Sequence, residues 1–508
     1  MNTTYSEQEH VRIEKRKALQ ALGIDPYPAA TFATNTTAQD ILTNYPSKPA
    51  AYQQVVLAGR LMSRRIMGAA AFVELQDARG RIQLYVHRDS LCPAEDKTLY
   101  NTVFKKLLDI GDIIGVQGYV FTTKLGTISV HVTQLTVLTK ALKPLPVVKE
   151  VTTQGEKKTY DAFADPEQRY RQRYADLIVN PHVRDTFIQR AQVIRSIRQY
   201  LDAQGYLEVE TPVLQPLHGG AAARPFKTHH NALDIPLYLR IANELYLKRL
   251  IVGGYDSVYE FAKVFRNEGM SRFHNPEFTV LETYVAYKDY LWMMDQTEAL
   301  IEKVALDLHG TPQVQVGAHT INFQRPWKRF TMFEAIEHFT GIDISQMEEE
   351  ALRNTAHQLG VAIEDTAGKG KIIDALFGSQ CEPKLIQPTF ITDYPVAMSP
   401  LAKRHRNNPD LVERFEVICN GKEICNAFSE LNDPIDQRQR FEAQLALAQR
   451  GDEEAMAMDE DFLRALRYGM PPTVGLGIGI DRLAMIMTNA ASIQEVIFFP
   501  QMRPKSKA

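Results

Sequence analysis

The chain has 508 residues, is 44% apolar and 23% charged, and carries a formal net charge of −3. This length predicts two to four domains, and this composition excludes a collagen-like, coiled-coil or disordered chain. Because the charge is almost balanced, any nucleic-acid site must be a local patch. The cysteines form no C-x-x-C pair. We therefore expect no disulfide framework, no zinc site and a reducing, cytoplasmic location.

The N-terminal residues predict a helix and no targeting signal. Ser6 and Glu9 match a capping box at the start of a helix over residues 6–22. No apolar run approaches the length of a membrane span, so we expect no membrane segment. Three cations share one face of this helix and form either a solvated basic face or a phosphate-contacting arm, namely Arg12, Lys15 and Arg16.

Residues 54–140 are rich in short strands with glycine-containing turns, which predicts a small closed barrel. Strand alternation puts Val73 on the inner face and Phe72 and Gln83 on the outer face. An exposed ring beside an amide and the basic pair Arg64-Arg65 could stack and read a single-stranded base. A cross-strand aromatic pair that only stabilises the sheet remains the alternative.

The chain is predicted to have four parts. They are an N-terminal helical extension (1–50), the barrel (51–145), a linker rich in proline and charge (146–165) and a large α+β domain (166–508). Within the last part, residues of about 331–380 are predicted to be a helical insertion.

Two of the sequence motifs combine charged and aromatic residues on predicted strands. Arg266 ends one strand, and Phe278, Glu282 and Tyr284 share one face of the next. A guanidinium can bind phosphate oxygens, an aromatic ring can stack on a base, and a carboxylate on such a face needs solvent or a cation.

The second motif is a hairpin whose turn is predicted at Asn420-Gly421. Ideal pairing puts Glu416 and Glu423 on one face, where they are either an acidic surface or ligands of a hard divalent cation. Asn426 and Glu430 lie an odd number of residues from Glu423, so a bulge is required for all four to line one cavity.

A third motif, Gly475-Leu-Gly-Ile-Gly-Ile-Asp-Arg482, resembles a glycine-rich phosphate loop, although it lacks the context of a dinucleotide-binding fold. Together the three motifs closely resemble the class II aminoacyl-tRNA synthetases, and within them the bacterial lysine-specific members. Further matches are Gly205–Pro212, Arg64–Gly68, Gly219–Asn231 and Phe428–Asp433, so the resemblance covers residues from about 54 to 504.

This resemblance implies an α+β protein with a five-stranded OB-fold barrel that reads the anticodon and an antiparallel catalytic sheet flanked by helices. It implies a homodimer with L-lysine, ATP and tRNA(Lys) as ligands, Mg²⁺ bound with ATP, no organic cofactor and no membrane. The implied reaction forms lysyl-adenylate and diphosphate, after which the tRNA 3′-terminal hydroxyl takes the lysyl group and AMP leaves.

The resemblance also assigns roles to individual residues. It assigns ATP to Arg266, Glu268, His274, Phe278, Glu416, Glu423 and Arg482, with Arg266 and Arg482 catalytic and with Glu416 and Glu423 as Mg²⁺ ligands. It assigns L-lysine to Gly220, Glu244, Arg266, Glu282, Tyr284, Asn426, Phe428, Glu430 and Gly477. It assigns the anticodon to Arg64, Phe72 and Gln83.

The chain departs from the family pattern at two positions of the hairpin, where Cys425 and Ala427 replace glycines. Since Cys425 lies between Glu423 and Asn426, we expect a bulky thiol reagent to block activation. A sister enzyme for aspartate or asparagine would need an arginine instead of Glu282 and Glu430. A ligase for a lysine analogue would lack the barrel, and a non-catalytic paralogue would have lost Arg266 or Arg482.

Overall fold

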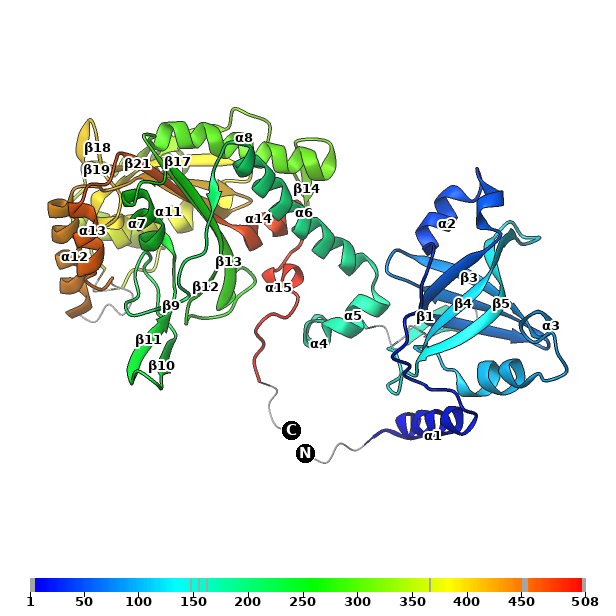
Figure 1. Ribbon diagram of the computed structural model, residues 1–508. Helices are drawn as coiled ribbons and strands as arrows, with labels where there is room; N and C mark the ends of the chain where they lie inside the picture. The colour runs from blue at the N-terminus through cyan, green and yellow to red at the C-terminus, as the bar shows by residue number, and fades with distance from the viewer. Residues whose placement is uncertain are drawn as a thin grey trace. The chain divides into compact units, whose positions relative to one another are not determined.

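The computed structural model describes residues 5–146, 149–153, 156–160, 163–364, 367–449 and 456–504. The chain divides into two compact units, residues 1–164 and 165–508 (Figure 1). Among the described residues, no helix is long and apolar enough to span a bilayer.

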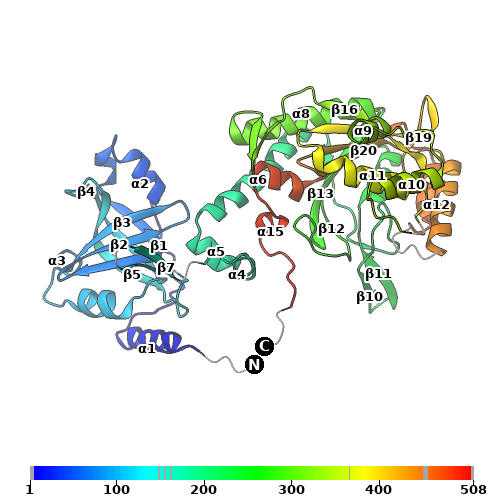
Figure 2. The ribbon, with the colours of Figure 1, turned by 180° about the vertical axis from the view of Figure 1, so that it is seen from behind.

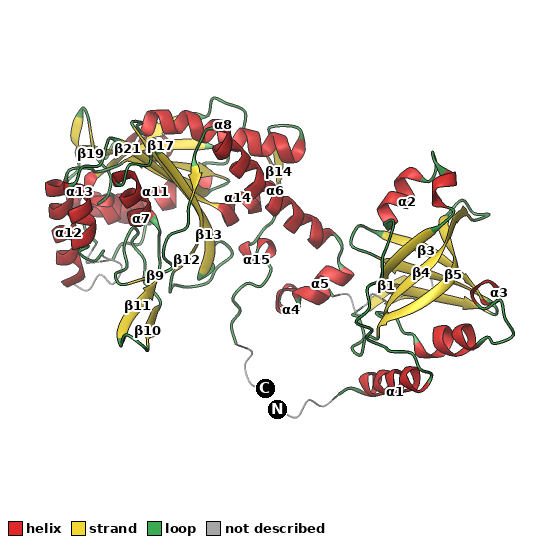
Figure 3. Cartoon of the chain, viewed as in Figure 1, coloured by secondary structure: helices red, strands yellow, loops and turns green. Residues whose placement is uncertain are grey.

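The first unit is built on a closed barrel with the strand order β1-β2-β3-β5-β4 (Figure 3). The strands are β1 (Val55–Met67), β2 (Ala70–Gln76), β3 (Arg81–His87), β4 (Ile113–Thr122) and β5 (Ile128–Thr139). Buried residues alternate with half-buried ones along β2 and β3. The predicted barrel and its inner face, with Val73 inside, are therefore confirmed.

Helix α1 (Glu7–Ala21) has the predicted capping box, in which the Ser6 hydroxyl accepts from the Glu9 amide. Its basic face is used within the unit. Arg12 donates to the carbonyl groups of Ala141 and Ile110 at 3.0 and 2.9 Å, and Lys15 pairs with Asp109 at 2.5 Å. Because two of the three cations brace the barrel, these contacts favour a structural role over a phosphate-contacting arm.

The remaining elements of the first unit are short. They are α2 (Ala38–Asn44), α3 (Arg88–Leu91), a 3-10 turn (Pro49–Tyr52) and a π-helical segment (Leu99–Leu107). Within the expected linker, β6 (Lys149–Thr153) and β7 (Glu156–Tyr160) form an antiparallel pair. Residues 147–148, 154–155 and 161–162 of that linker, like residues 1–4 of the N-terminal extension, lie outside the described residues.

The second unit contains a large sheet with the strand order β16-β17-β19-β20-β21-β13-β12-β8, and β18 pairs with β19 beside this path. Its strands are β8 (Leu207–Glu208), β12 (Ser257–Phe265), β13 (Glu277–Ala286), β16 (Lys328–Thr331), β17 (Thr389–Pro395), β18 (Arg404–His405), β19 (Asn408–Cys419), β20 (Lys422–Ser429) and β21 (Thr473–Gly479). Neighbours are antiparallel except at β8–β12 and β16–β17, so the predicted antiparallel core is confirmed.

One face of this sheet packs against α6 (His182–Ala203), α8 (Tyr290–His309) and α14 (Ile480–Met487). Val417, Leu476 and Leu281 point into that core together with apolar residues of the helices. Because strand side chains alternate, the residues between them point to the opposite face.

The second unit has a further apolar cluster formed by α9 (Met332–Thr340), α10 (Glu349–Gln358) and α11 (Lys369–Gln380), which lie together in Figure 2. Two small sheets are formed by β9 (Leu214–Gln215), β10 (Lys227–His230) and β11 (Ile235–Leu239), and by β14 (Gln313–Val316) and β15 (His319–Asn322). The other helices are α4 (Pro166–Arg171), α5 (Arg173–Val179), α7 (Glu244–Val252), α12 (Pro434–Gln449), α13 (Glu460–Arg467) and α15 (Ile493–Val496), with 3-10 turns at Glu382–Lys384 and Val396–Met398.

The hairpin between β19 and β20 has the predicted two-residue turn, with Asn420 at φ 52° and Gly421 at φ 70°. Both values lie in the left-handed region that this turn type requires. The pairing changes from Ile418 opposite Glu423 to Val417 opposite Cys425, so Ile424 is an extra residue. This is the bulge needed for the four residues to line one cavity, and it brings Asn426 onto the face of Glu416 and Glu423.

Candidate active site

The register of four neighbouring strands arranges the predicted residues in two rows across the sheet face that points away from α6 and α8. In one row, Glu416 lies opposite Asn426, Asn426 opposite Gly477, and Gly477 opposite Glu282. In the adjacent row, Phe428 lies opposite Gly475, and Gly475 opposite Tyr284. Residues that are far apart in the sequence, such as Glu282, Glu416 and Gly477, thus meet on one surface.

The glycines of β21 provide the space that the acidic side chains occupy. A Cβ atom at Gly475 would overlap the Glu430 carboxylate and the Tyr284 ring, and a Cβ at Gly477 would lie 3.0 Å from Glu282 Oε1. The glycine motif is therefore part of a central strand and not a phosphate-binding turn. Its glycines permit a pocket at the middle of a sheet.

Three carboxylates converge on this pocket. Glu282 accepts a hydrogen bond of 3.1 Å from the Tyr284 hydroxyl, and Glu430 and Glu244 both pair with the ammonium group of Lys248. The Glu244–Lys248 distance is 2.5 Å, and Lys248 has no exposed side-chain surface. The pocket is thus a buried acidic site with one internal cation.

Burial changes the acidity of these groups. Burial, reinforced by the charge of Glu244, raises the pKa of Glu282 to about 8. Burial also raises the pKa of Glu244 and of Glu430. Burial alone would lower the pKa of Lys248, but Glu244 and Glu430 outweigh it and hold that pKa above its ordinary value. A cationic ligand would favour the ionised carboxylates.

Arg266 and Phe278 lie next to this pocket. The Arg266 guanidinium lies 5.2 Å from the centre of the Phe278 ring, and its buried Nε has no hydrogen-bond partner among the described residues. Burial lowers the pKa of Arg266, although Glu268 and Glu423 oppose the shift. A buried donor without a partner is costly unless a ligand supplies an acceptor.

A second cationic group lies at the other end of the site. Arg482, in the first turn of α14, donates to the Glu423 carbonyl at 2.8 Å and carboxylate at 3.2 Å, and its Nη2 lies 3.2 Å from His274 Nε2. Burial, followed by the charge of Arg482, lowers the pKa of His274. A neutral His274 can accept or donate beside an anionic ligand.

The two predicted metal ligands lie on one face, and each is held by an arginine. Arg414 binds Glu416 at 2.5 Å and Asn426 at 2.8 Å, while Arg482 pairs with Glu423. Burial raises the pKa of Glu416 to about 7. The positive charge of Arg414 opposes this shift, and the negative charge of Glu423 adds to it. Carboxylates that repel one another in this way suit a shared divalent cation.

The other predicted ligands surround the same pocket. Gly220, at φ +85°, approaches the start of α7, where a Cβ atom would lie 3.3 Å from Glu244 Cβ. The Phe428 ring lies 5.4 Å from the Lys248 ammonium group. Glu268 is exposed in the loop after β12. The structure thus brings the predicted ATP and lysine ligands together on one side of the sheet.

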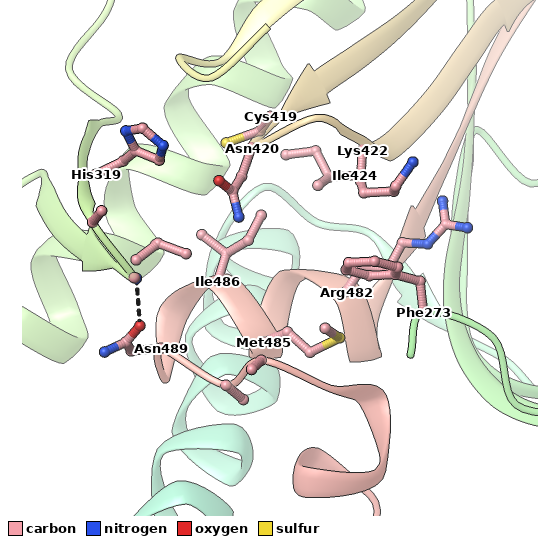
Figure 4. A pocket seen from close by; sticks show the side chains of 15 residues that line it. Phe273, His319, Cys419, Asn420, Lys422, Ile424, Arg482, Met485, Ile486 and Asn489 are labelled. Carbon is pink, nitrogen blue, oxygen red and sulfur yellow. Dashed lines mark hydrogen bonds between the residues drawn. The ribbon is translucent and has the colours of Figure 1, made fainter. Parts of the chain in front are cut away.

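Figure 4 shows a separate, mostly apolar cavity of about 280 Å³. It lies between the β14–β15 hairpin, the β19–β20 turn and α14, and Asn489 closes one side by accepting from the Gly317 amide at 2.7 Å. Of the predicted site residues only Arg482 lines it. This cavity adjoins the candidate site but does not contain the acidic pocket.

The expectation for Cys425 is wrong. Its side chain is 1% exposed and packs in the core beneath the sheet, because the bulge at Ile424 places Cys425 opposite Val417, which points into the same core. Burial raises the pKa of this thiol well above its ordinary value. A buried, protonated thiol is a poor target for thiol reagents.

In the first unit, Phe72 and Gln83 lie on the outer face of the barrel as predicted. Phe72 packs on Tyr85 with ring centres 5.3 Å apart, and Tyr85 contacts His131 at 5.2 Å. Gln83 accepts a hydrogen bond of 2.8 Å from Ser129. These rings are half-buried and form one continuous aromatic surface.

Arg64 does not share that surface, which corrects the prediction. A register shift in β1 places Arg64 opposite the inward-facing Val73 and places Arg65 opposite Phe72. Arg64 donates to the Phe104 carbonyl and stacks near that ring. Arg65 therefore replaces Arg64 as the cation beside the aromatic surface.

Sequence reasoning missed two cations in the site. Lys248 follows Glu244 by four residues, a spacing that predicts only an exposed helical ion pair. Arg414 lies two residues before Glu416, so the alternation of side chains along a strand puts both on one face. The acidic residues around each cation become visible only when the strands and α7 are assembled.

Comparison with known families gives two matches to the chain. Residues 165–503 match the class II tRNA synthetases of the aspartate, lysine and asparagine group, and residues 55–138 match the OB-fold nucleic-acid-binding domains. The first match alone covers more than half of the chain.

The chain is also similar to curated proteins over almost its whole length. It is 62% identical over 504 residues to a lysine–tRNA ligase of Porphyromonas gingivalis, covering 99% of this chain and 86% of that protein. It is 58% identical to that of Christiangramia forsetii, covering 99% and 87%, and 56% identical to that of Azobacteroides pseudotrichonymphae, covering 98% and 99%.

Proposed function

The chain belongs to the class II lysine–tRNA ligases, and we propose that its buried acidic pocket selects L-lysine for ATP-dependent attachment to tRNA(Lys). The observation that carries this assignment is the convergence of Glu244, Glu282 and Glu430 beside Arg266, whose buried Nε has no hydrogen-bond partner among the described residues. Two ammonium groups and one carboxylate would satisfy these residues, and lysine has that set of charges.

The binding mode follows from the positions of the charges. Glu244 and Gly220 receive the α-ammonium group, and Glu282, Tyr284 and Glu430 receive the ε-ammonium group. Phe428 contacts the aliphatic stem, and Asn426 helps to hold the carboxylate near Arg266. Buried hydrogen bonds between opposite charges are stronger than neutral ones and reject ligands that lack the partner charge.

ATP would lie on the adjacent part of the same surface. Phe278 stacks on the adenine, Glu268 binds its edge, and His274 and Arg482 bind the outer phosphates. Arg266 lies between the nucleotide and the amino acid, where it stabilises the charge that develops as the lysine carboxylate attacks the α-phosphorus. Neither step needs a protein nucleophile, because positioning and charge stabilisation are sufficient.

Glu416 and Glu423 fit a Mg²⁺ ion that arrives with ATP. Among the described residues, no cluster of three acidic, histidine or cysteine side chains forms a protein-only metal site. Mg²⁺ usually needs only one or two carboxylates in addition to substrate phosphates. Such an ion would neutralise phosphate charge, while Arg414 and Arg482 orient the two carboxylates.

The OB-fold barrel is proposed to bind the anticodon through Phe72, Gln83 and Arg65. We expect Phe72→Ala to lower the efficiency of tRNA(Lys) charging by about five- to 150-fold, since a base–aromatic stack contributes roughly 1–3 kcal/mol. Lysine-dependent ATP–diphosphate exchange should be unchanged, because that step uses only the catalytic unit. Both reactions and the melting temperature are measured on one preparation.

A matched control for this variant is Leu22→Ala, which removes an exposed apolar side chain from the same unit. It should leave charging, exchange and melting temperature unchanged. An anticodon role for Phe72 is excluded if charging is unaffected, if exchange falls equally, or if the charging defect disappears at a temperature where the variant is fully folded.

A homodimer is proposed on the segment that follows α6. Within it, Leu207, Val213, Leu214 and Leu217 all expose apolar side chains to solvent. Strand β8 ends the sheet on this side. Exposed apolar residues that follow one another in a short segment beside an exposed sheet edge are typical of a surface covered by another protein.

A further inference from the structure

The lysine pocket contains a cation of its own, which is unexpected in a site for a dicationic amino acid. Lys248 lies in the second turn of α7 and is completely buried. Its ammonium group pairs with Glu244 of the same helix and with Glu430, which follows β20. These two carboxylates would receive opposite ends of the substrate.

Lys248 therefore connects the two ends of the pocket. A single ammonium group touches both carboxylates, and its position is fixed by the rings of Phe428 and Phe462 at 5.4 and 5.9 Å. Glu282 accepts from Tyr284 and forms no ion pair within 4 Å among the described residues. Buried carboxylates without compensation would repel one another and take up protons.

The charges of the pocket then match the substrate. Three carboxylates and Lys248 leave two formal negative charges when all are ionised. Lysine brings two ammonium groups, and its carboxylate is matched by Arg266. Without Lys248 the pocket would carry a third negative charge that no part of lysine neutralises.

We propose that Lys248 is a positioning residue for L-lysine, which holds Glu244 and Glu430 ionised and in place so that the pocket fits two ammonium groups. This inference rests on the proposed function and acts through the two carboxylates, not through contact with the reacting atoms. It predicts that Lys248 affects lysine binding but not ATP binding.

The test uses Lys248→Met, which removes the charge and keeps an unbranched stem, and Lys248→Arg, which keeps the charge. Lys303→Met is the matched control, because Lys303 forms the same helical i,i+4 pair, with Asp307 at 2.7 Å, on an exposed surface. The KM values for lysine and ATP are measured by ATP–diphosphate exchange, lysine affinity is measured by calorimetry between pH 6 and 9.5, and melting temperature is recorded.

The pH profile reports the charge of the carboxylates. Because an ammonium ion binds the ionised form, wild-type affinity for lysine should increase with pH as the pocket carboxylates lose their protons. These are Glu244 and Glu430, whose pKa values are raised by burial, and Glu282, with a pKa of about 8. Loss of a neighbouring cation raises a carboxyl pKa by about 1–3 units. In Lys248→Met the profile should therefore move at least about one unit toward alkaline pH.

The groups that face these carboxylates are Glu244, Lys248, Arg266, Glu282, Tyr284, Arg414 and Glu430. Of these, only Lys248 is altered by the test variants. At neutral pH we expect Lys248→Met to raise the lysine KM at least about tenfold, with the ATP KM within about twofold. Lys248→Arg should keep the wild-type pH midpoint and show a smaller increase in KM.

Either of two results for folded Lys248→Met would overturn the proposal, namely an unchanged lysine KM and pH midpoint, or equal increases in the lysine and ATP KM. If Lys248→Met does not fold, Lys248→Arg decides, since a shift of its pH midpoint by one unit or more contradicts the role of the charge. Failure of the wild-type chain to bind lysine would instead contradict the proposed function.

Discussion

Arg266→Ala is expected to reduce lysine-dependent ATP–diphosphate exchange by about 100- to 1000-fold or more. The Arg266 guanidinium lies 5.2 Å from the Phe278 ring, between the proposed nucleotide and amino-acid positions, and within the described part of the chain its buried Nε has no hydrogen-bond partner. Its charge would stabilise the pentacoordinate α-phosphate more strongly than the ground state. The loss should therefore appear mainly in kcat.

The matched control is Arg325→Ala, which removes an exposed arginine paired with Glu302 at 2.8 Å in the same unit. This variant should exchange at the wild-type rate. An Arg266→Ala enzyme that is folded and exchanges within about twofold of wild type would show that Arg266 does not act on the α-phosphate.

Glu430→Gln is expected to weaken lysine much more than ATP. Truncating one charge of a buried, hydrogen-bonded pair costs roughly 2–5 kcal/mol, which corresponds to about 30- to 5000-fold in kcat/KM for lysine. The side chain has no exposed surface and pairs with Lys248, so the amide would also leave that ammonium group with only one carboxylate. The KM for ATP should change by no more than about twofold.

A buried glutamate elsewhere in the fold provides the control. Glu298 lies on α8, which covers the sheet face opposite the candidate site. Its side chain is 4% exposed and accepts from the Trp327 amide at 2.9 Å. Glu298→Gln should alter melting temperature but not the ratio of the lysine and ATP KM values. Equal changes in both constants for Glu430→Gln would assign Glu430 a structural role.

Local patterns predicted much of the fold. The alternation of Phe72 and Val73 gave the two faces of β2, and Asn420-Gly421 gave the hairpin with both residues in the left-handed region. Counting residues from Glu423 showed that a bulge was needed for all four polar residues to line one cavity, and the bulge is found at Ile424. Such features depend on neighbours in the sequence, which is why they can be predicted from it.

Features that depend on the assembled sheet were missed. Arg64 was expected beside the aromatic surface, but a one-residue shift in β1, which reverses every following side chain, places it opposite the inward-facing Val73. Cys425 was expected in the pocket because it lies between Glu423 and Asn426, but it pairs with Val417 and points into the core. Lys248 was not singled out from the sequence, because its role depends on Glu430, which follows β20 and approaches α7 only in the folded chain.

The central claim is that the pocket selects lysine, and amino-acid-dependent ATP–diphosphate exchange tests it most directly. The reaction is run with Mg²⁺, without tRNA, and with each of the twenty amino acids in turn. We predict rapid exchange with L-lysine alone, because only lysine supplies ammonium groups to both Glu244 and the Glu282–Glu430 end of the pocket. Exchange driven best by aspartate or asparagine, or no exchange with lysine, would contradict the account.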